Sequence, residues 1–189
     1  NGLGDREQWN SMLPPATYKQ LQQRVDLDFS YTKKTHVAAD EQVGLLLNAL
    51  RETQRMDSAL IVFNADHGES FGSHGVFGHG ASVYQDTVHV PLVVKLPGQT
   101  KGFRIPTPVS GVDILPTVAD VLGLPVPDAV DGYSLRAPPI QARSLIVESS
   151  EGDGTWMRGL VRGTTKLIVR EQNFELYDLS SDPDELIDL

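Results

Sequence analysis

Four residues in one short stretch, Asp66, His67, His74 and His79, carry side chains that could bind a metal ion and an anion. They follow the apolar run 59–63, and glycines stand among them at positions 68, 72, 75, 78 and 80. Carboxylate oxygen and imidazole nitrogen together suit a divalent cation such as calcium, manganese or zinc. Glycines also let the backbone approach a ligand closely. The pattern therefore favours a metal pair at Asp66 and His67 over an ordinary turn capped by Asp66.

The apolar run that precedes these residues indicates where the fold places them. Residues 59–63 are apolar without alternation, which is typical of a strand covered on both faces in a parallel sheet. Ligands of open α/β sheets bind just beyond the carboxyl ends of such strands. We therefore expect an α/β fold with Asp66 and His67 at the functional edge of its sheet.

Other segments supply the rest of the expected architecture. Residues 5–30 should form a loop leading into a short helix, and apolar spacing predicts an amphipathic helix over 35–54. Asp113 is a natural N-cap for a helix that buries Ile114, Leu115, Val118, Val121 and Leu122 and ends at Gly123. Strands are expected at 90–96 and 145–148, a small antiparallel sheet at 159–161, 166–169 and 175–177, and a helix beginning at Pro183. Residues 1–150 and 151–189 are the expected domains.

Composition excludes several classes of function. The net charge is −9 and no basic patch occurs, so nucleic-acid binding is not expected. The chain has no cysteine, which excludes disulfides, thiolate metal ligands and a cysteine nucleophile. No apolar stretch approaches the roughly 20 residues of a membrane-spanning helix, so no membrane span is expected.

Several motifs in one order resemble the sulfatase family of the alkaline phosphatase superfamily. They are A-D-H-G-E-S-F-G-S-H-G at 65–75, G-H-G-A-S-V-Y-Q-D at 78–86, H-V-P-L-V-V at 89–94, G-V-D-I-L-P-T-V-A-D-V-L-G-L-P at 111–125 and E-L-Y-D-L-S-S-D-P-D-E-L at 175–186. Each motif is weak alone, but their collinearity extends over nearly the whole chain from Tyr31. The resemblance implies a mostly parallel, alkaline-phosphatase-like sheet flanked by helices, followed by a small antiparallel sheet and a helix.

The resemblance also implies roles for the four residues. Asp66 and His67 would bind one divalent ion, with calcium expected first and manganese, magnesium or zinc as alternatives. His79 would be the catalytic residue that contacts the sulfuryl group or protonates the leaving oxygen, and His74 a substrate-binding or loop-bracing residue. The implied substrate is a small-molecule or glycan sulfate ester. Because bacterial members are often exported, the resemblance favours a periplasmic or secreted location.

The chain departs from the family where the nucleophile should be. Sulfatases carry a formylglycine made in a C/S-x-P-x-R motif near the N-terminus, preceded by an aspartate pair, and this chain has neither. It also begins without Met, in what reads as the middle of a loop. We therefore expect a C-terminal portion of a sulfatase-like protein that is inactive alone and needs the N-terminal nucleophile segment.

Two other interpretations remain open at this point. The motif D-H-G-E-S with a later H-G also fits a phosphodiester or phosphonate hydrolase, or a phosphoethanolamine-type transferase, of the same superfamily. A non-catalytic binding module that kept the fold would equally lack the nucleophile. Substrate assays and the sequence upstream of Asn1 would separate these possibilities.

Overall fold

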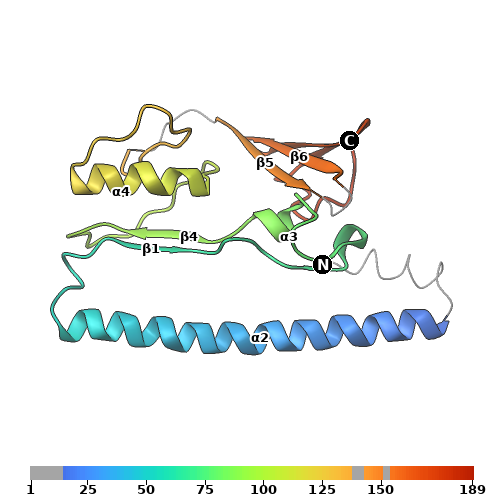
Figure 1. Cartoon of the computed structure of the whole chain (residues 1–189), viewed down its shortest axis with the longest axis horizontal. Coiled ribbons are helices and arrows are strands. Elements are labelled where there is room, and N and C mark those ends of the chain that lie inside the picture. The colour runs from blue at the N-terminus through green and yellow to red at the C-terminus, as the bar shows by residue number, and fades with distance from the viewer. Residues whose placement is uncertain (1–14, 138–142, 151–153) are drawn as a thin grey trace. The chain divides into compact units, whose positions relative to one another are not determined.

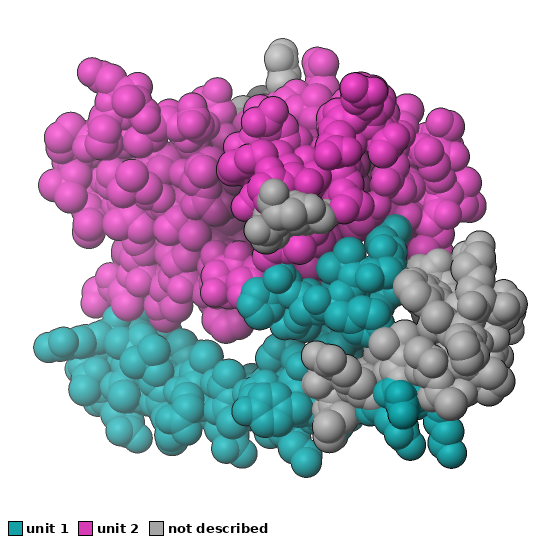
Figure 2. Space-filling view, turned by 45° about the vertical axis from the view of Figure 1, so that its right-hand side comes forward, with its two compact units in different colours: residues 1–56, 69–79 teal, residues 57–68, 80–189 magenta. Residues whose placement is uncertain are grey.

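The computed structural model describes residues 15–137, 143–150 and 154–189. The chain forms two compact units, coloured separately in Figure 2. Unit 1 comprises residues 1–56 and 69–79, and unit 2 comprises residues 57–68 and 80–189. Asp66 and His67 thus belong to unit 2, whereas His74 and His79 belong to unit 1.

A single long helix, α2, dominates unit 1 and extends from Pro15 to Glu52 (Figure 1). Residues 5–30 were expected to form a loop leading into a short helix; residues 5–14 lie outside the described residues, and from residue 15 the chain is helical without interruption into the predicted helix over 35–54. Pro15 occupies the first helical position, where its missing N–H costs nothing, and no glycine or further proline interrupts the helix before Gly44. Within the described ranges, no helix is both long and apolar enough to cross a lipid bilayer.

The second part of unit 1 is a small hairpin. Strand β2 (Ser70–Phe71) pairs antiparallel with β3 (Phe77–Gly78), and the 3₁₀ turn η1 (Ser73–Gly75) connects them. Phe71 packs edge-on against Phe29 of α2, with ring centroids 5.4 Å apart. The Ser70 hydroxyl donates to the carbonyl of Val76 at 3.0 Å and so braces the turn.

In unit 2, strand β1 (Ile61–Asn64) pairs with β4 (Leu92–Lys95). The two predicted strands are present, but the pairing is antiparallel, as it is for every strand pair that the structure describes. The expected burial on both faces is also wrong for these strands, because Phe63 is 46% and Val93 59% exposed. An apolar run alone does not reveal strand direction, since both sheet types accept it.

The segment between β4 and the C-terminal sheet contains η2 (Gly111–Asp113) and the helix α4 (Ile114–Leu122). The predicted end at Gly123 is confirmed, with φ of 66°. Asp113 stands at the predicted N-cap position of α4, but its side chain makes no capping hydrogen bond to that helix. Its Oδ2 instead accepts the N–H of Ser110, the residue before η2, at 2.9 Å. Asp113 also accepts from the Tyr133 N–H at 2.8 Å. The predicted buried face is wrong as well, since the residues buried in α4 are Pro116, Thr117 and Ala119.

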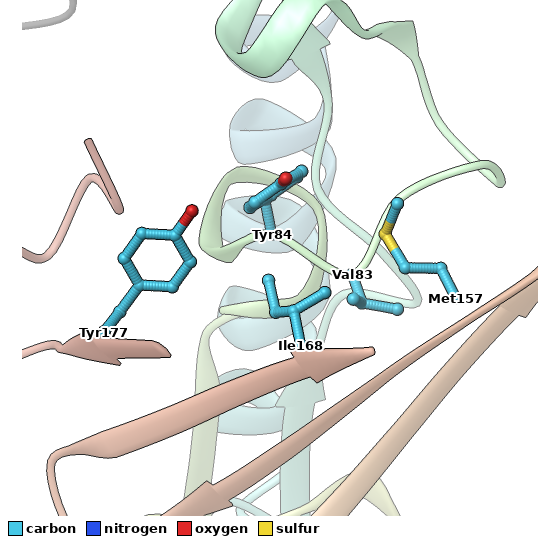
Figure 3. Packing of buried hydrophobic residues seen from close by; sticks show 5 residues of the cluster. All are labelled: Val83, Tyr84, Met157, Ile168 and Tyr177. Carbon is cyan, nitrogen blue, oxygen red and sulfur yellow. The ribbon is translucent and has the colours of Figure 1, made fainter. Parts of the chain in front are cut away.

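Four antiparallel strands form the C-terminal sheet of unit 2, in the order of the sequence. They are β5 (Ser144–Ser150), β6 (Trp156–Arg162), β7 (Thr165–Arg170) and β8 (Asn173–Asp178). The predicted small antiparallel sheet is thus confirmed. Its buried face packs on the segment before the short helix α3 (Gln85–Val88), where Val83, Tyr84, Met157, Ile168 and Tyr177 form the core (Figure 3).

The tail after β8 differs from the prediction. Residues 179–189 form turns instead of the expected helix at Pro183. Glu185 has a left-handed φ of 57°, which a right-handed helix cannot contain, and its side chain is buried. Strand β5 lies before the expected domain boundary at 150 but pairs with β6 beyond it, and the boundary itself stays a prediction.

Candidate active site

The two predicted metal ligands lie next to each other just beyond β1. Asp66 Oδ2 is 3.7 Å from His67 Nε2, close enough for one ion to contact both atoms. The other carboxylate oxygen, Oδ1, accepts the His67 backbone N–H at 3.0 Å. The side chain of Asp66 is 88% exposed and that of His67 43% exposed, so solvent reaches both groups.

The imidazole of His67 is oriented by its own loop. His67 Nδ1 lies 2.8 Å from the carbonyl oxygen of Gly68. Because a carbonyl only accepts hydrogen bonds, this contact puts the proton on Nδ1 and the lone pair on Nε2. Metal-bound histidines are held in the same manner, with one ring nitrogen donating to a carbonyl and the other binding the ion. The donor set therefore fits a divalent cation.

Gly68 fixes this loop against α3. Its N–H donates to the Thr87 carbonyl at 2.8 Å. A Cβ atom added to Gly68 would lie 2.0 Å from the carbonyl oxygen of Asp86, a distance that no side chain tolerates. Glycine is thus required here by close backbone approach. Gly68 does not have a positive φ, so a left-handed backbone is not the reason for glycine at this position.

His79 stands at the open end of the hairpin in unit 1. Its Nδ1 lies 3.0 Å from Glu69 Oε2. The two residues come directly before β2 and directly after β3, whose register pairs Ser70 with Gly78, so they are opposite each other across the hairpin. Because a carboxylate only accepts hydrogen bonds, this contact places a proton on Nδ1 of His79. Glu69 is a candidate functional residue that was not predicted from the sequence. Finding it would have required knowledge of the pairing of β2 with β3.

His74 lies in η1 of the same unit, with a left-handed φ of 52° and a half-buried side chain. Its substrate-binding role stays a prediction. Over the described ranges, no three histidine or carboxylate side chains gather as a complete metal site. Asp66 and His67 therefore form a pair that can supply part of a ligand set.

Comparison with known proteins is consistent with these motifs. The family model described as Sulfatase matches residues 18–124. The chain is 31% identical to the uncharacterized sulfatase YidJ of Escherichia coli over 159 residues, which cover 79% of this chain and 31% of YidJ. It is 30% identical to human arylsulfatase K over 166 residues, covering 78% of this chain and 30% of the relative. The chain thus spans about a third of the length of these relatives.

Solved structures give the same result for the fold. The structure of BT1596, a 2-O GAG sulfatase, matches with a TM-score of 0.68 and 27% identity, covering 80% of this chain and 36% of the other. BT4656, solved in complex with its substrate D-glucosamine-2-N,6-O-disulfate, matches with a TM-score of 0.67 and 26% identity, covering 80% and 34%. The predicted alkaline-phosphatase-like α/β class is confirmed by these neighbours, and the chain belongs to the sulfatase family.

Proposed function

We propose that the protein containing this chain hydrolyses a sulfate ester, with a glycan sulfate as its substrate class. The family supports sulfate ester chemistry, and two neighbouring structures are described with sulfated sugars or glycosaminoglycans. The observation that carries the proposal is the Asp66–His67 pair, in which a carboxylate oxygen and an imidazole Nε2 stand 3.7 Å apart. The nucleophile would come from a segment outside this chain.

Asp66 and His67 would supply part of the ligand set of one divalent cation. Calcium is the expected ion, and manganese, magnesium and zinc are the comparisons, because an imidazole nitrogen suits zinc better than it suits calcium. Such an ion would activate the nucleophile and neutralise charge on the oxygens of the sulfuryl group. The chain's own contribution is to hold His67 as the Nδ1–H tautomer through the Gly68 carbonyl.

His79 would act on the anionic group or on the leaving oxygen. With Nδ1 held by Glu69, its Nε2 can donate a proton or a hydrogen bond to an oxygen of the ester. A positioned acid of this kind contributes roughly 10²–10⁴-fold to rate, so His79→Ala should lower kcat by that order. His36→Ala, at an exposed position on α2, is the matched control and should leave kcat unchanged.

The substrate class is tested with the intact protein and a matched set of esters. Glucosamine 6-O-sulfate, an aryl sulfate, a phosphodiester and a phosphonate ester are compared at equal concentration. Faster turnover of the sulfate esters supports the proposal. A preference for the phosphodiester or phosphonate would favour the other branch of the superfamily, and binding without turnover of any ester would favour a non-catalytic module.

The metal is tested by chelation and by substitution. Removing divalent ions with EDTA should abolish turnover, and adding back each of the four ions in turn identifies the one that restores it. Asp66→Asn should weaken metal affinity by more than the roughly 10–100-fold seen for outer-shell changes. Asp40→Asn, a control at an exposed carboxylate of α2, should leave it unchanged. Full activity after exhaustive chelation would refute the metal proposal.

A further inference from the structure

A buried ion pair in the C-terminal part of unit 2 lies far along the chain from the metal pair. Lys166 on β7 and Glu185 in the tail are 0% and 1% exposed, and Lys166 Nζ is 2.5 Å from Glu185 Oε1. Burial lowers the pKa of Lys166, while the charges of Glu185 and Asp86 act to raise it. Buried charges are rare unless they are paired, and the pairing alone does not explain why the fold keeps them.

Both charged groups bind the backbone of one short segment, residues 82–88. Lys166 Nζ donates to the Val83 carbonyl at 2.6 Å and to Gln85 Oε1 at 3.2 Å. Glu185 Oε2 accepts the N–H of Gln85, the first residue of α3, at 2.6 Å. The ion pair therefore fixes the start of α3 from two directions.

The tail adopts an unusual conformation to reach this position. Glu185 has φ of 57°, in the left-handed region that a non-glycine residue seldom occupies, and the predicted tail helix is absent. Backbone strain of this kind persists only where surrounding contacts over-determine it. Here those contacts are the ion pair of the Glu185 carboxylate with Lys166 and the hydrogen bond that it accepts from the Gln85 N–H.

The other end of the same segment holds the metal-pair loop. Thr87 is 4% exposed, its hydroxyl donates to the Tyr84 carbonyl at 2.9 Å, and its own carbonyl accepts the Gly68 N–H at 2.8 Å. The Gly68 carbonyl in turn accepts from His67 Nδ1. An unbroken series of bonds thus leads from the ion pair through α3 to the ring of His67, all within unit 2.

We propose that Lys166 and Glu185 are positioning residues for the Asp66–His67 pair, acting through residues 82–88. Their function is to hold α3 where Thr87 can bind Gly68, and so to set the orientation of His67. This inference rests on the proposed metal site but not on any particular substrate.

The test compares two variants of the intact protein, one with a double and one with a single substitution. Lys166→Met with Glu185→Leu replaces the ion pair by apolar groups of similar size, a change that buried pairs often tolerate. Arg143→Met is the matched control, because Arg143 pairs with the buried Asp113 beside α4, and its other contacts are with the Asp131 carbonyl and the Tyr133 ring. Both variants are scored for urea unfolding, for divalent-metal affinity and, without metal, for amide exchange at Gly68 measured by NMR.

We expect the double variant to bind the metal about tenfold more weakly, in the range of outer-shell effects, and to exchange the Gly68 amide faster. Arg143→Met should lower the free energy of unfolding but leave the metal affinity and the exchange of the Gly68 amide unchanged. The proposal would be overturned if the Gly68 amide exchanged at an unchanged rate in the folded double variant. It would also be overturned if both variants, at matched stability, changed metal affinity and amide exchange equally. If the double variant fails to fold, Glu185→Gln is scored by the same comparison. If the unmodified protein binds no metal, the proposed function fails, and amide exchange still decides the positioning role.

Discussion

Replacing Gly68 by alanine tests how closely the metal-pair loop must approach α3. The added Cβ would lie 2.0 Å from the Asp86 carbonyl oxygen, and real Cβ contacts essentially never fall below 3.0 Å. The loop must therefore move by at least about 1 Å, and the 2.8 Å bond from Gly68 N–H to Thr87 would break. A misplacement of about 1 Å at a catalytic group can cost about 100-fold in rate.

We expect Gly68→Ala to lower kcat/KM by about 100-fold, which corresponds to about 2.7 kcal/mol. The lost hydrogen bond should reduce the free energy of unfolding by about 0.5–1.5 kcal/mol, with steric strain adding to this. Steady-state kinetics at saturating metal, metal titration and urea unfolding separate the two effects.

Gly132 offers an unusually close control for this experiment. A Cβ there would lie 2.0 Å from the Val112 carbonyl oxygen in η2, so alanine meets the same backbone conflict at a different element. Gly132→Ala should therefore lose stability to a similar degree but keep its kcat/KM. A folded Gly68→Ala variant with kcat/KM within about threefold of the unmodified protein would refute the reasoning, as would an equal kinetic loss in Gly132→Ala.

Two further predictions concern the remaining polar contacts. Glu69→Gln should lower kcat without changing metal affinity, because it removes the carboxylate that lies 3.0 Å from His79 Nδ1. The loss in kcat should not exceed that of His79→Ala. A change in metal affinity would contradict this prediction. Burial, then hydrogen bonds to a shared glutamate, raise the pKa of both Tyr84 and Tyr177 above the ordinary value of 10. Above pH 10 the unfolded chain therefore loses these protons while the folded chain keeps them, and the free energy of unfolding should fall by about 1.4 kcal/mol per pH unit for each tyrosine. Tyr177→Phe should remove about half of that slope in urea unfolding between pH 10 and 11.5, whereas Tyr31→Phe, at an exposed position, should not.

The positions of the helices and strands could be predicted from the sequence better than the pairing and direction of the strands. Apolar spacing located β1, β4, the end of α4 at Gly123 and the C-terminal strands, since these patterns depend on local burial and turn chemistry. It did not reveal that β1 and β4 pair antiparallel, because a short apolar run suits either direction. The length of helix α2 was underestimated, since residues 15–34 are mostly polar and helix propensity alone gave little signal.

The candidate site shows the same division. Asp66 and His67 were predicted as metal ligands from residue type and spacing, and His79 as a catalytic residue from the family resemblance; these roles stay predictions. Glu69 was missed because its contact with His79 depends on the register of a two-residue hairpin. Glu185 was placed in a helix because Asp-Pro-Asp-Glu is a good helix start, whereas a buried lysine 2.5 Å away decides its conformation. Long-range pairing of this kind leaves no periodic trace in a sequence.

The Lys166–Glu185 pair also bears on the order in which unit 2 can fold. Lys166 is made before Glu185, and its ammonium cannot be buried favourably until that carboxylate arrives. The sheet can therefore not close over Val83 while the tail is still missing, however complete its hairpins are. Folding of β7, α3 and the tail should be a single cooperative event that waits for the synthesis of Glu185. A nascent chain that stops short of this residue would expose Val83 and Ile168, the surface that chaperones recognise.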